Sequence, residues 1–434
     1  MTIVLSLLLL SVQAQQELNY TEVNHHSYEL LSQGKWKELI NYSEEARQQG
    51  IDFFYLQART GIAYYNLEKY RLASGWFLKA WKRDQSFDWL QEYLYYSLLF
   101  GGRATEASQT AGSFFPEMKE KIGYVSNQLT RVGIEAGYSF NPRFDASTAS
   151  PHGQQVGVGE NYGEAFYLKD YHFESFDLSH RISPGFYMNH NLQYISQSQE
   201  QHADWGVGYN YPIKISQLQY FLNPHFILGK KLYVSPSFTL IWGNYDLIMG
   251  DYEPMSFYLS TNKYADFVFS TATWFHWGNF SPGAEINLAG INDENFTQLS
   301  AWLTVYPLSN LNFYFTPRIY LKGNTNNELT YNTFGISGGL QLGPVHFYGS
   351  YQNGRMENFI EYAGYLVYNF PGSTKQKFSG SIFFPAGKKY QFALRYVLQD
   401  MTETYWVYTD MIRTNSVNYT YTKHTLTAGI AWNF

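Results

Sequence analysis

The pattern of apolar positions changes once along the chain, near residue 126. From about residue 17 to 125, apolar residues recur at the three-to-four-residue spacing of one face of a helix. From Gln128 onward they recur at every second position, as where Val132, Ile134 and Ala136 alternate with Gly133 and Glu135. This period predicts strands with one apolar and one polar face. The sequence therefore predicts a helical domain over 17–125 and an all-β domain over 126–434.

The helical part repeats with a period of 34 residues, the distance from Trp36 to Tyr70 and from Ala46 to Ala80. In the clearest unit, small residues allow two helices to approach and aromatic residues fill the space between them. These positions are Gly61, Tyr64, Tyr70, Ala73, Phe77 and Ala80. The spacing resembles the tetratricopeptide repeat.

Two further units are weaker. The unit at about 18–50 has Leu39 where the clear unit has Ala73, and adding 34 to the clear unit reaches a degenerate third unit. A generic antiparallel helical bundle is the alternative. Stacked repeats leave a concave surface that binds partners. The candidates to line it are Tyr28, Tyr55, Arg59 and Tyr95.

The β part contains six predicted tight turns that alternate with seven longer polar stretches, hence fourteen strands. An even number suits a closed membrane barrel with both ends on one side, and splitting 202–212 and 358–370 into strands would give sixteen. A soluble all-β sandwich is the alternative. The tight turns are expected near 183–185, 229–231, 278–279, 307–309, 343–344 and 386–388, and the longer stretches near 142–163, 197–215, 246–258, 290–295, 323–329, 352–375 and 406–416.

The final strand carries apolar residues at every second position, ending in Ile430, Trp432 and Phe434. It resembles the terminal aromatic strand of Gram-negative outer-membrane β-barrels. In those proteins the barrel-assembly machinery recognises this strand. The resemblance implies an outer-membrane location with lipid around the barrel, and Trp432 and Phe434 as the assembly signal. We expect the first strand, near 130–141, to close against the last, near 416–434, because an open edge in lipid is costly.

Composition agrees with export to a membrane. Residues 1–14 are typical of a secretory signal, with an ordinary buried helix as the alternative. Aromatic residues make up 19% of the chain and charged residues 15%, a balance that suits the aromatic girdles of membrane barrels. No segment reaches the length of an apolar α-helical span. The net charge of −6 provides no basic field for nucleic acid.

Chemistry-bearing motifs are sparse. His25 and His26 are neighbours on a helix, so they point to different faces and do not chelate one metal. Gly157-Val158-Gly159 precedes no helix and is not a phosphate-binding loop. We therefore predict that the protein is not an enzyme and holds no metal or cofactor.

Four charged residues occupy the polar phase of predicted strands: Glu135, Arg318, Lys322 and Arg395. A basic side chain facing lipid at mid-depth costs about 2–4 kcal/mol, so we expect these side chains in the barrel lumen. There they either line a pore or pair with one another to block it. Glu135 and Arg395 are one conceivable pair.

A signal segment, a tetratricopeptide-type domain and a barrel together resemble outer-membrane exopolysaccharide exporters and the YaiO-like barrel proteins. The resemblance implies export of a saccharide-related or other envelope cargo, with a periplasmic partner bound through residues 17–125. The alternative is a non-conducting accessory subunit of an assembly or secretion complex. Exporters usually carry more repeats than this chain, and it has no acidic cluster to guide a cationic polymer. Long loops such as 352–375 are expected to fold over or into the barrel mouth.

Overall fold

The computed structural model describes residues 18–145, 161–204, 208–229, 231–251, 256–323, 329–387, 389–409 and 412–434. It divides into two compact units, Met1–Ser97 and Leu98–Phe434. The predicted signal segment 1–14 and most of the predicted loop 142–163 lie outside the described residues. The division falls earlier than residue 125, so the last helices of the predicted repeat domain belong to the unit that contains the β part.

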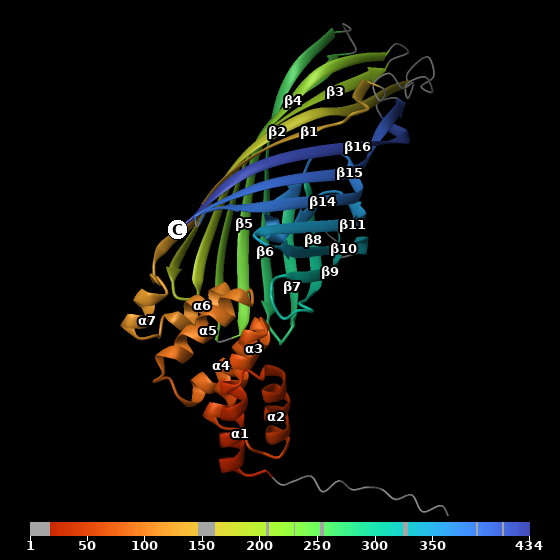
Figure 1. The fold of residues 1–434 in the computed structure, drawn as a ribbon. Coiled ribbons are helices and arrows are strands. Elements are labelled where there is room, and N and C mark those ends of the chain that lie inside the picture. The colour runs from red at the N-terminus through yellow and green to blue at the C-terminus, as the bar shows by residue number, and fades with distance from the viewer. Residues whose placement is uncertain are drawn as a thin grey trace, which may run out of the picture. The chain divides into compact units, whose positions relative to one another are not determined.

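The first unit consists of helix pairs that recur every 34 residues. Helices α1, α3 and α5 begin at residues 20, 54 and 88, and α2 and α4 begin at 36 and 70 (Figure 1). Gly61 in α3 lies so close to α4 that a Cβ atom would come within 2.6 Å of the Phe77 ring. None of the described helices combines the length and apolarity needed to cross a membrane. The bounds are α1 Tyr20–Ser32, α2 Trp36–Gln48, α3 Phe54–Asn66, α4 Tyr70–Arg83 and α5 Asp88–Phe100.

In the second unit the described residues form a closed antiparallel barrel of 14 strands, which confirms the predicted fold class and strand number (Figure 1). Neighbours in the chain are neighbours in the barrel throughout, except that β11 is followed by β14. The strands are β1 Gln128–Phe140, β2 Asn161–Ser183, β3 Phe186–Asp204, β4 Gly208–Leu228, β5 Leu232–Asp251, β6 Ser256–Phe275, β7 Phe280–Ile291, β8 Glu294–Val305, β9 Phe313–Gly323, β10 Leu329–Leu342, β11 Val345–Met356, β14 Ser373–Ala386, β15 Tyr390–Thr409 and β16 Ile412–Asn433.

The barrel closes where β1 pairs with β16, as the sequence predicts. The register runs from Arg131 opposite Asn433 to Phe140 opposite His424. Beyond it, the Phe434 N–H donates to the Thr130 carbonyl at 3.1 Å. This continuous pairing leaves no unpaired edge at the seam, which is the condition for a sheet to exist in lipid.

Several predicted loops are wrong because the strands continue through them. β3 runs to Asp204 and β4 starts at Gly208, inside the stretch 197–215, and only Asn292 and Asp293 separate β7 from β8. The polar residues that suggested a loop belong to the inward face of tall strands: Gln197, Gln199 and Gln201 are all buried. The stretches 246–258 and 406–416 are likewise mostly strand.

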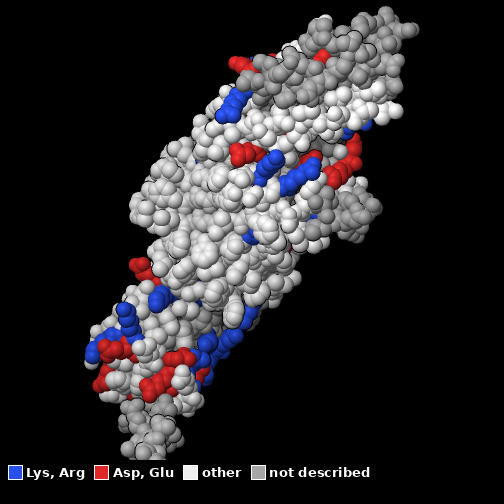
Figure 2. Space-filling view, turned by 90° about the vertical axis from the view of Figure 1, so that its right-hand side faces the viewer, with Lys and Arg blue, Asp and Glu red and all other residues white. Residues whose placement is uncertain are grey.

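The two faces of the wall differ as in a membrane barrel. Large apolar side chains are exposed on the outside, whereas buried side chains on the inside are rich in amides and hydroxyls. Figure 2 shows broad areas of one face without charged side chains. This arrangement inverts that of a soluble sandwich and excludes it. Outward examples are Ile134, Ile336, Leu394 and Leu426, and inward examples are Gln217, Gln219, Thr239 and Gln298.

We call the barrel end that holds the tight turns and the C-terminus the proximal end, and the opposite end the distal end. At the distal end β15 extends past β14 and pairs directly with β2, with Trp406 opposite Glu164. At Gly163 a Cβ atom would lie 1.6 Å from the Tyr405 hydroxyl, so any other residue there would displace this buried ring. Buried residues that include Tyr167, Tyr405 and Tyr421 pack behind this junction.

At the proximal end, helix α6 (Ala104–Ala111) docks against the barrel, followed by α7 (Pro116–Lys121). Thr105 lies 2.9 Å from the His225 ring nitrogen, and the Tyr233 hydroxyl donates to Glu106 at 3.1 Å. Arg181 donates to Ser108 at 3.1 Å. Helix α6 thus covers inward-facing groups of β2, β4 and β5.

Candidate functional site: a plugged barrel chamber

A segment between β11 and β14 folds inside the barrel, and we call residues 357–372 the plug. It contains β12 (Phe359–Glu361), a 3-10 turn η2 (Tyr362–Gly364) and β13 (Leu366–Tyr368). β12 and β13 pair with each other as a separate two-stranded sheet. The predicted loop 352–375 therefore does enter the lumen, with a secondary structure of its own.

Side chains of the barrel wall supply the hydrogen bonds that the plug backbone needs. The Gln298 amide is bidentate to Ile360: it donates to the carbonyl at 2.6 Å and accepts from the N–H at 3.1 Å. Thr239 donates to the Gly364 carbonyl at 2.7 Å, and Gln219 to the Tyr365 carbonyl at 3.1 Å. Buried backbone groups without partners are costly, so these side chains act in place of a neighbouring strand.

Charged groups hold the first five residues of the plug. Lys377 of β14 donates to Glu361 at 2.7 Å, with both side chains buried. Lys322 of β9 donates to the Glu357 carbonyl at 3.1 Å and to Glu294 at 3.3 Å. A buried pair of this kind is strongly destabilising to break, because it leaves an uncompensated charge.

Apolar packing and backbone strain complete the description of the plug. Ile360 and Val367 are buried in one cluster with β5–β8 residues such as Ile241 and Phe296. Tyr362 and Ala363 have φ angles of 53° and 55°, in the left-handed region that costs non-glycine residues about 1–3 kcal/mol each. Such strain persists only where the surrounding contacts impose it, and it clusters at switch segments.

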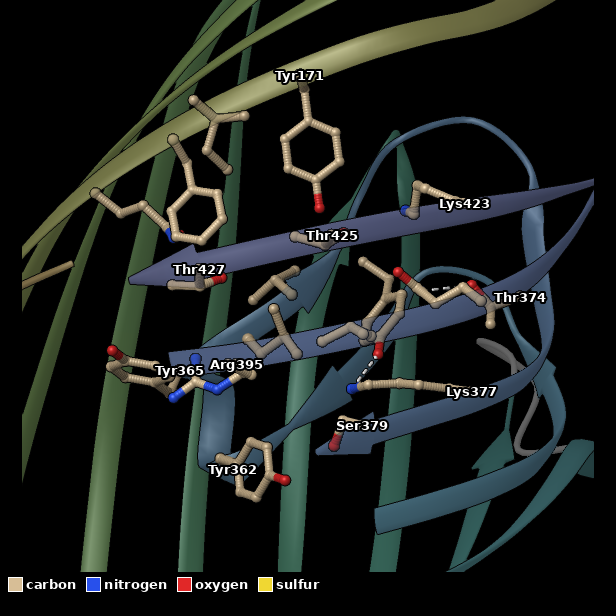
Figure 3. Close-up of a pocket in the computed structure, with 18 of the residues that line it drawn as sticks. Tyr171, Tyr362, Tyr365, Thr374, Lys377, Ser379, Arg395, Lys423, Thr425 and Thr427 are labelled. Carbon is tan, nitrogen blue, oxygen red and sulfur yellow. Dashed lines mark hydrogen bonds between the residues drawn. The ribbon is translucent and has the colours of Figure 1, made fainter. Parts of the chain in front are cut away.

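The plug bonds to strands on several sides of the barrel, among them β2 through Asp177 and β14 through Lys377. A chamber of about 640 Å³ remains beside it. This volume lies in the range of roughly 300–1,000 Å³ for small-molecule sites. Figure 3 shows the chamber between plug tyrosines and strands β14–β16. Its lining combines rings, hydroxyls, amides and charges, among them Tyr171, Phe173, Tyr362, Tyr365, Tyr368, Ser379, Ser381, Thr425, Thr427, Gln193, Gln219, Glu135, Lys377, Arg395 and Lys423.

The lining of β14–β16 follows directly from strand register. Lys377 lies opposite Gln399, which lies opposite Lys423. Strands are about 4.8 Å apart, so the two lysine backbones stand about 10 Å apart in one inward row. Farther toward the proximal end, Arg395 lies between Ser381 and Thr427.

The four predicted lumen residues lie in two places. The Arg395 guanidinium is 3.4 Å from Glu135, and both residues line the chamber. Arg318 lies 3.6 Å from Glu285 and stacks at 4.2 Å over the Trp302 ring, while Lys322 holds the plug. Arg318 and Lys322 are outside the described chamber lining.

Three of the four predicted partner-binding residues form one cluster in the first unit. The Arg59 guanidinium lies 5.4 Å from the Tyr28 ring and 5.5 Å from the Tyr55 ring. It donates to the Asn24 carbonyl at 2.7 Å, and burial lowers its pKa from the ordinary value. Tyr28 and Tyr55 are exposed. Tyr95 instead packs against Tyr96 on α5, with ring centroids 5.3 Å apart.

Within the described residues no group of three or more His, Asp or Glu side chains is arranged to hold a metal ion.

No protein-family model matches the chain, and no curated protein resembles it in sequence. Among solved structures, the Pseudomonas putida toluene transporter TodX is similar at 8% identity and a TM-score of 0.44, covering 76% of this chain and 94% of TodX. A Pseudomonas aeruginosa FadL homologue has 8% identity, a TM-score of 0.45 and coverages of 75% and 94%. The translocator domain of autotransporter NalP from Neisseria meningitidis has 8% identity, a TM-score of 0.31 and coverages of 77% and 94%.

Replacing Gln298 with Ala should loosen the plug, because it leaves the Ile360 N–H and carbonyl buried without partners. Each such group costs about 1–3 kcal/mol. We expect faster amide hydrogen exchange across 358–368, measured by mass spectrometry on the purified protein. Gln341→Ala is the control, since the exposed Gln341 amide donates only to Gly343 in a proximal turn. Unchanged plug exchange in Gln298→Ala would show that this amide does not anchor the plug.

Proposed function

We propose that the protein is an outer-membrane transport barrel whose plugged chamber conducts a saccharide-related or other small envelope cargo. The observation that supports this most is the lined chamber of about 640 Å³ that remains beside the plug. A segment that only filled the lumen would need no such space. The strained backbone at Tyr362 and Ala363 suits a segment that changes position during transport.

The location in the outer membrane of a Gram-negative bacterium is supported by the exterior of the barrel. Exposed apolar residues cover its outside, and Trp432 and Phe434 stack at 4.8 Å on the terminal strand, where the assembly machinery would read them. In this orientation the proximal end and the helices face the periplasm. The cargo preference is supported by chamber tyrosines beside amides and hydroxyls, a combination that suits flat rings bearing polar groups.

We further propose that residues 17–125 are tetratricopeptide-type repeats that bind a periplasmic partner. The 34-residue spacing of the helix starts supports the repeat assignment. The exposed rings of Tyr28 and Tyr55 around Arg59 are suited to an interface, where Tyr and Arg often dominate binding energy.

A second function has its own support. The plug occupies the lumen and α6 docks at its proximal end, so the barrel is also suited to serve as a non-conducting anchor for an assembly or secretion complex. The two functions differ in what happens when the plug is removed.

Replacing residues 358–371 with a short Gly-Ser turn should raise single-channel conductance in planar bilayers severalfold, because it removes the obstacle beside the chamber. The same variant should sensitise cells to large antibiotics. Heat-modifiable migration on gels serves as the control for correct folding. If the variant inserts normally and conductance and permeability stay flat, the anchor function replaces the transport function.

The double variant Tyr28→Ser/Tyr55→Ser should release the partner while leaving the barrel intact. We expect the proteins that co-purify with the wild-type chain after crosslinking in cells to be depleted several-fold. Lys37→Ser, at an exposed position of α2, is the matched control. An unchanged set of crosslinked proteins would contradict the role of this cluster.

A further inference from the structure

The chamber carries more cationic than anionic side chains. Strands β14–β16 contribute Lys377, Arg395 and Lys423 to its lining, and β1 contributes Arg131. The whole chain has a net charge of −6, so this excess does not follow from the composition. It is a local property of the chamber.

The nearby carboxylates are already engaged. Glu135 and Glu361 pair with Arg395 and Lys377 at 3.4 and 2.7 Å. Glu403, at the distal side of the chamber, accepts hydrogen bonds of 2.6 Å from both the Tyr419 and the Tyr421 hydroxyl. Its electrostatic interaction with Lys423 acts over a longer distance than a salt bridge. Within the described residues, Lys423 and Arg131 have no carboxylate oxygen within 4.0 Å.

Lys423 is the cation best placed to meet a ligand. Its ammonium lies 5.5 Å from the centre of the Tyr171 ring, and Figure 3 shows it reaching into the chamber. Lys377 stands two strands away in the same inward row, with Gln399 between them. A carboxylate placed beside Lys423 would gain a charge-assisted hydrogen bond, which is about twice as strong as a neutral one.

Hydroxyl groups and aromatic rings surround this row. Ser379 and Thr425 occupy the next inward row toward the proximal end, and Ser381 and Thr427 the one after it. Three plug tyrosines, 362, 365 and 368, also line the chamber, and Figure 3 shows Tyr362 and Tyr365 among the lining residues. Lys377 donates to the Tyr368 hydroxyl at 2.8 Å. The chamber thus offers cations, hydroxyls and flat apolar faces to one ligand.

We infer that the chamber binds an acidic sugar, a pyranose ring that bears a carboxylate. The carboxylate lies at Lys423, the sugar hydroxyls meet Ser379, Thr425 and their neighbours, and the ring rests on the tyrosines. This inference rests on the proposed transport function and narrows its cargo. A neutral sugar leaves Lys423 without a counter-charge, and a cationic sugar is repelled.

The test is calorimetric titration of the full-length protein in detergent with a galacturonic acid trimer and with its neutral galactose counterpart. A hydrogen bond to a charged group contributes enough for about tenfold or more in affinity, so we expect the acidic trimer to bind at least about tenfold more tightly at low salt. Lys423→Gln should abolish this preference, and Lys423→Arg should retain it. Lys214→Gln, at an exposed position of β4, should leave it unchanged.

Equal affinities for the two trimers, or an unchanged preference in a correctly folded Lys423→Gln variant, would overturn the inference. Binding of sulfate as tightly as the acidic trimer would also overturn it, because the chamber would then be a plain anion site. These outcomes are distinguishable from failure of the transport function. If the plug-shortened variant conducts but the protein shows no preference for the acidic trimer, the transport function stands and only the acidic cargo is rejected.

Discussion

The structure depends on one constraint: backbone N–H and C=O groups that are shielded from water must find partners within the chain. In lipid each unsatisfied group costs several kcal/mol, so the sheet has to close. The pairing of β1 with β16 meets this requirement along the seam, up to the bond from the Phe434 N–H to Thr130. At the distal end, where β14 has ended, the edge of β15 finds a partner in β2.

The same constraint explains how the plug is held. β12 and β13 pair only with each other, so each presents an outer edge inside the barrel. Wall side chains take the place of neighbouring strands, most clearly the bidentate amide of Gln298. Such contacts can be broken without dismantling the barrel, whereas contacts between wall strands cannot. An element fixed by side chains is therefore the one suited to move.

Much of this architecture could be predicted from periodicity. The 34-residue period indicated where the helix pairs lie. The alternation of apolar and polar residues, which begins near Val132 and ends at Phe434, predicted the closed barrel and its seam. The prediction failed where inward polar residues were read as loops, as with Gln197, Gln199 and Gln201. Alternation of apolar and polar residues distinguishes a strand from a polar loop only when the outward face of the strand is clearly apolar.

Less of the chamber could be predicted from the sequence. Glu135 and Arg395 could be paired because they lie on the first and penultimate strands, which the closed barrel brings near each other. The row that contains Lys377 and Lys423 depends on the register of three strands, which single-strand patterns do not contain. The position of the plug depends on the hydrogen bonds that Gln298 and Thr239 of the wall make with the plug backbone. Those contacts join segments far apart in sequence.

The central claim is that the inward face of β16 borders an aqueous chamber that the plug restricts. The chain contains no cysteine, so single cysteines can be introduced at two adjacent positions, Thr425→Cys on the chamber side and Leu426→Cys on the exposed outer side. The measurement is the rate of reaction with a water-soluble thiol reagent in membranes. The account predicts slow labelling at 425 with the plug present, at least about tenfold faster labelling when residues 358–371 are replaced, and negligible labelling at 426 in both. Equal rates at 425 with and without the plug, or equal rates at 425 and 426, would contradict it.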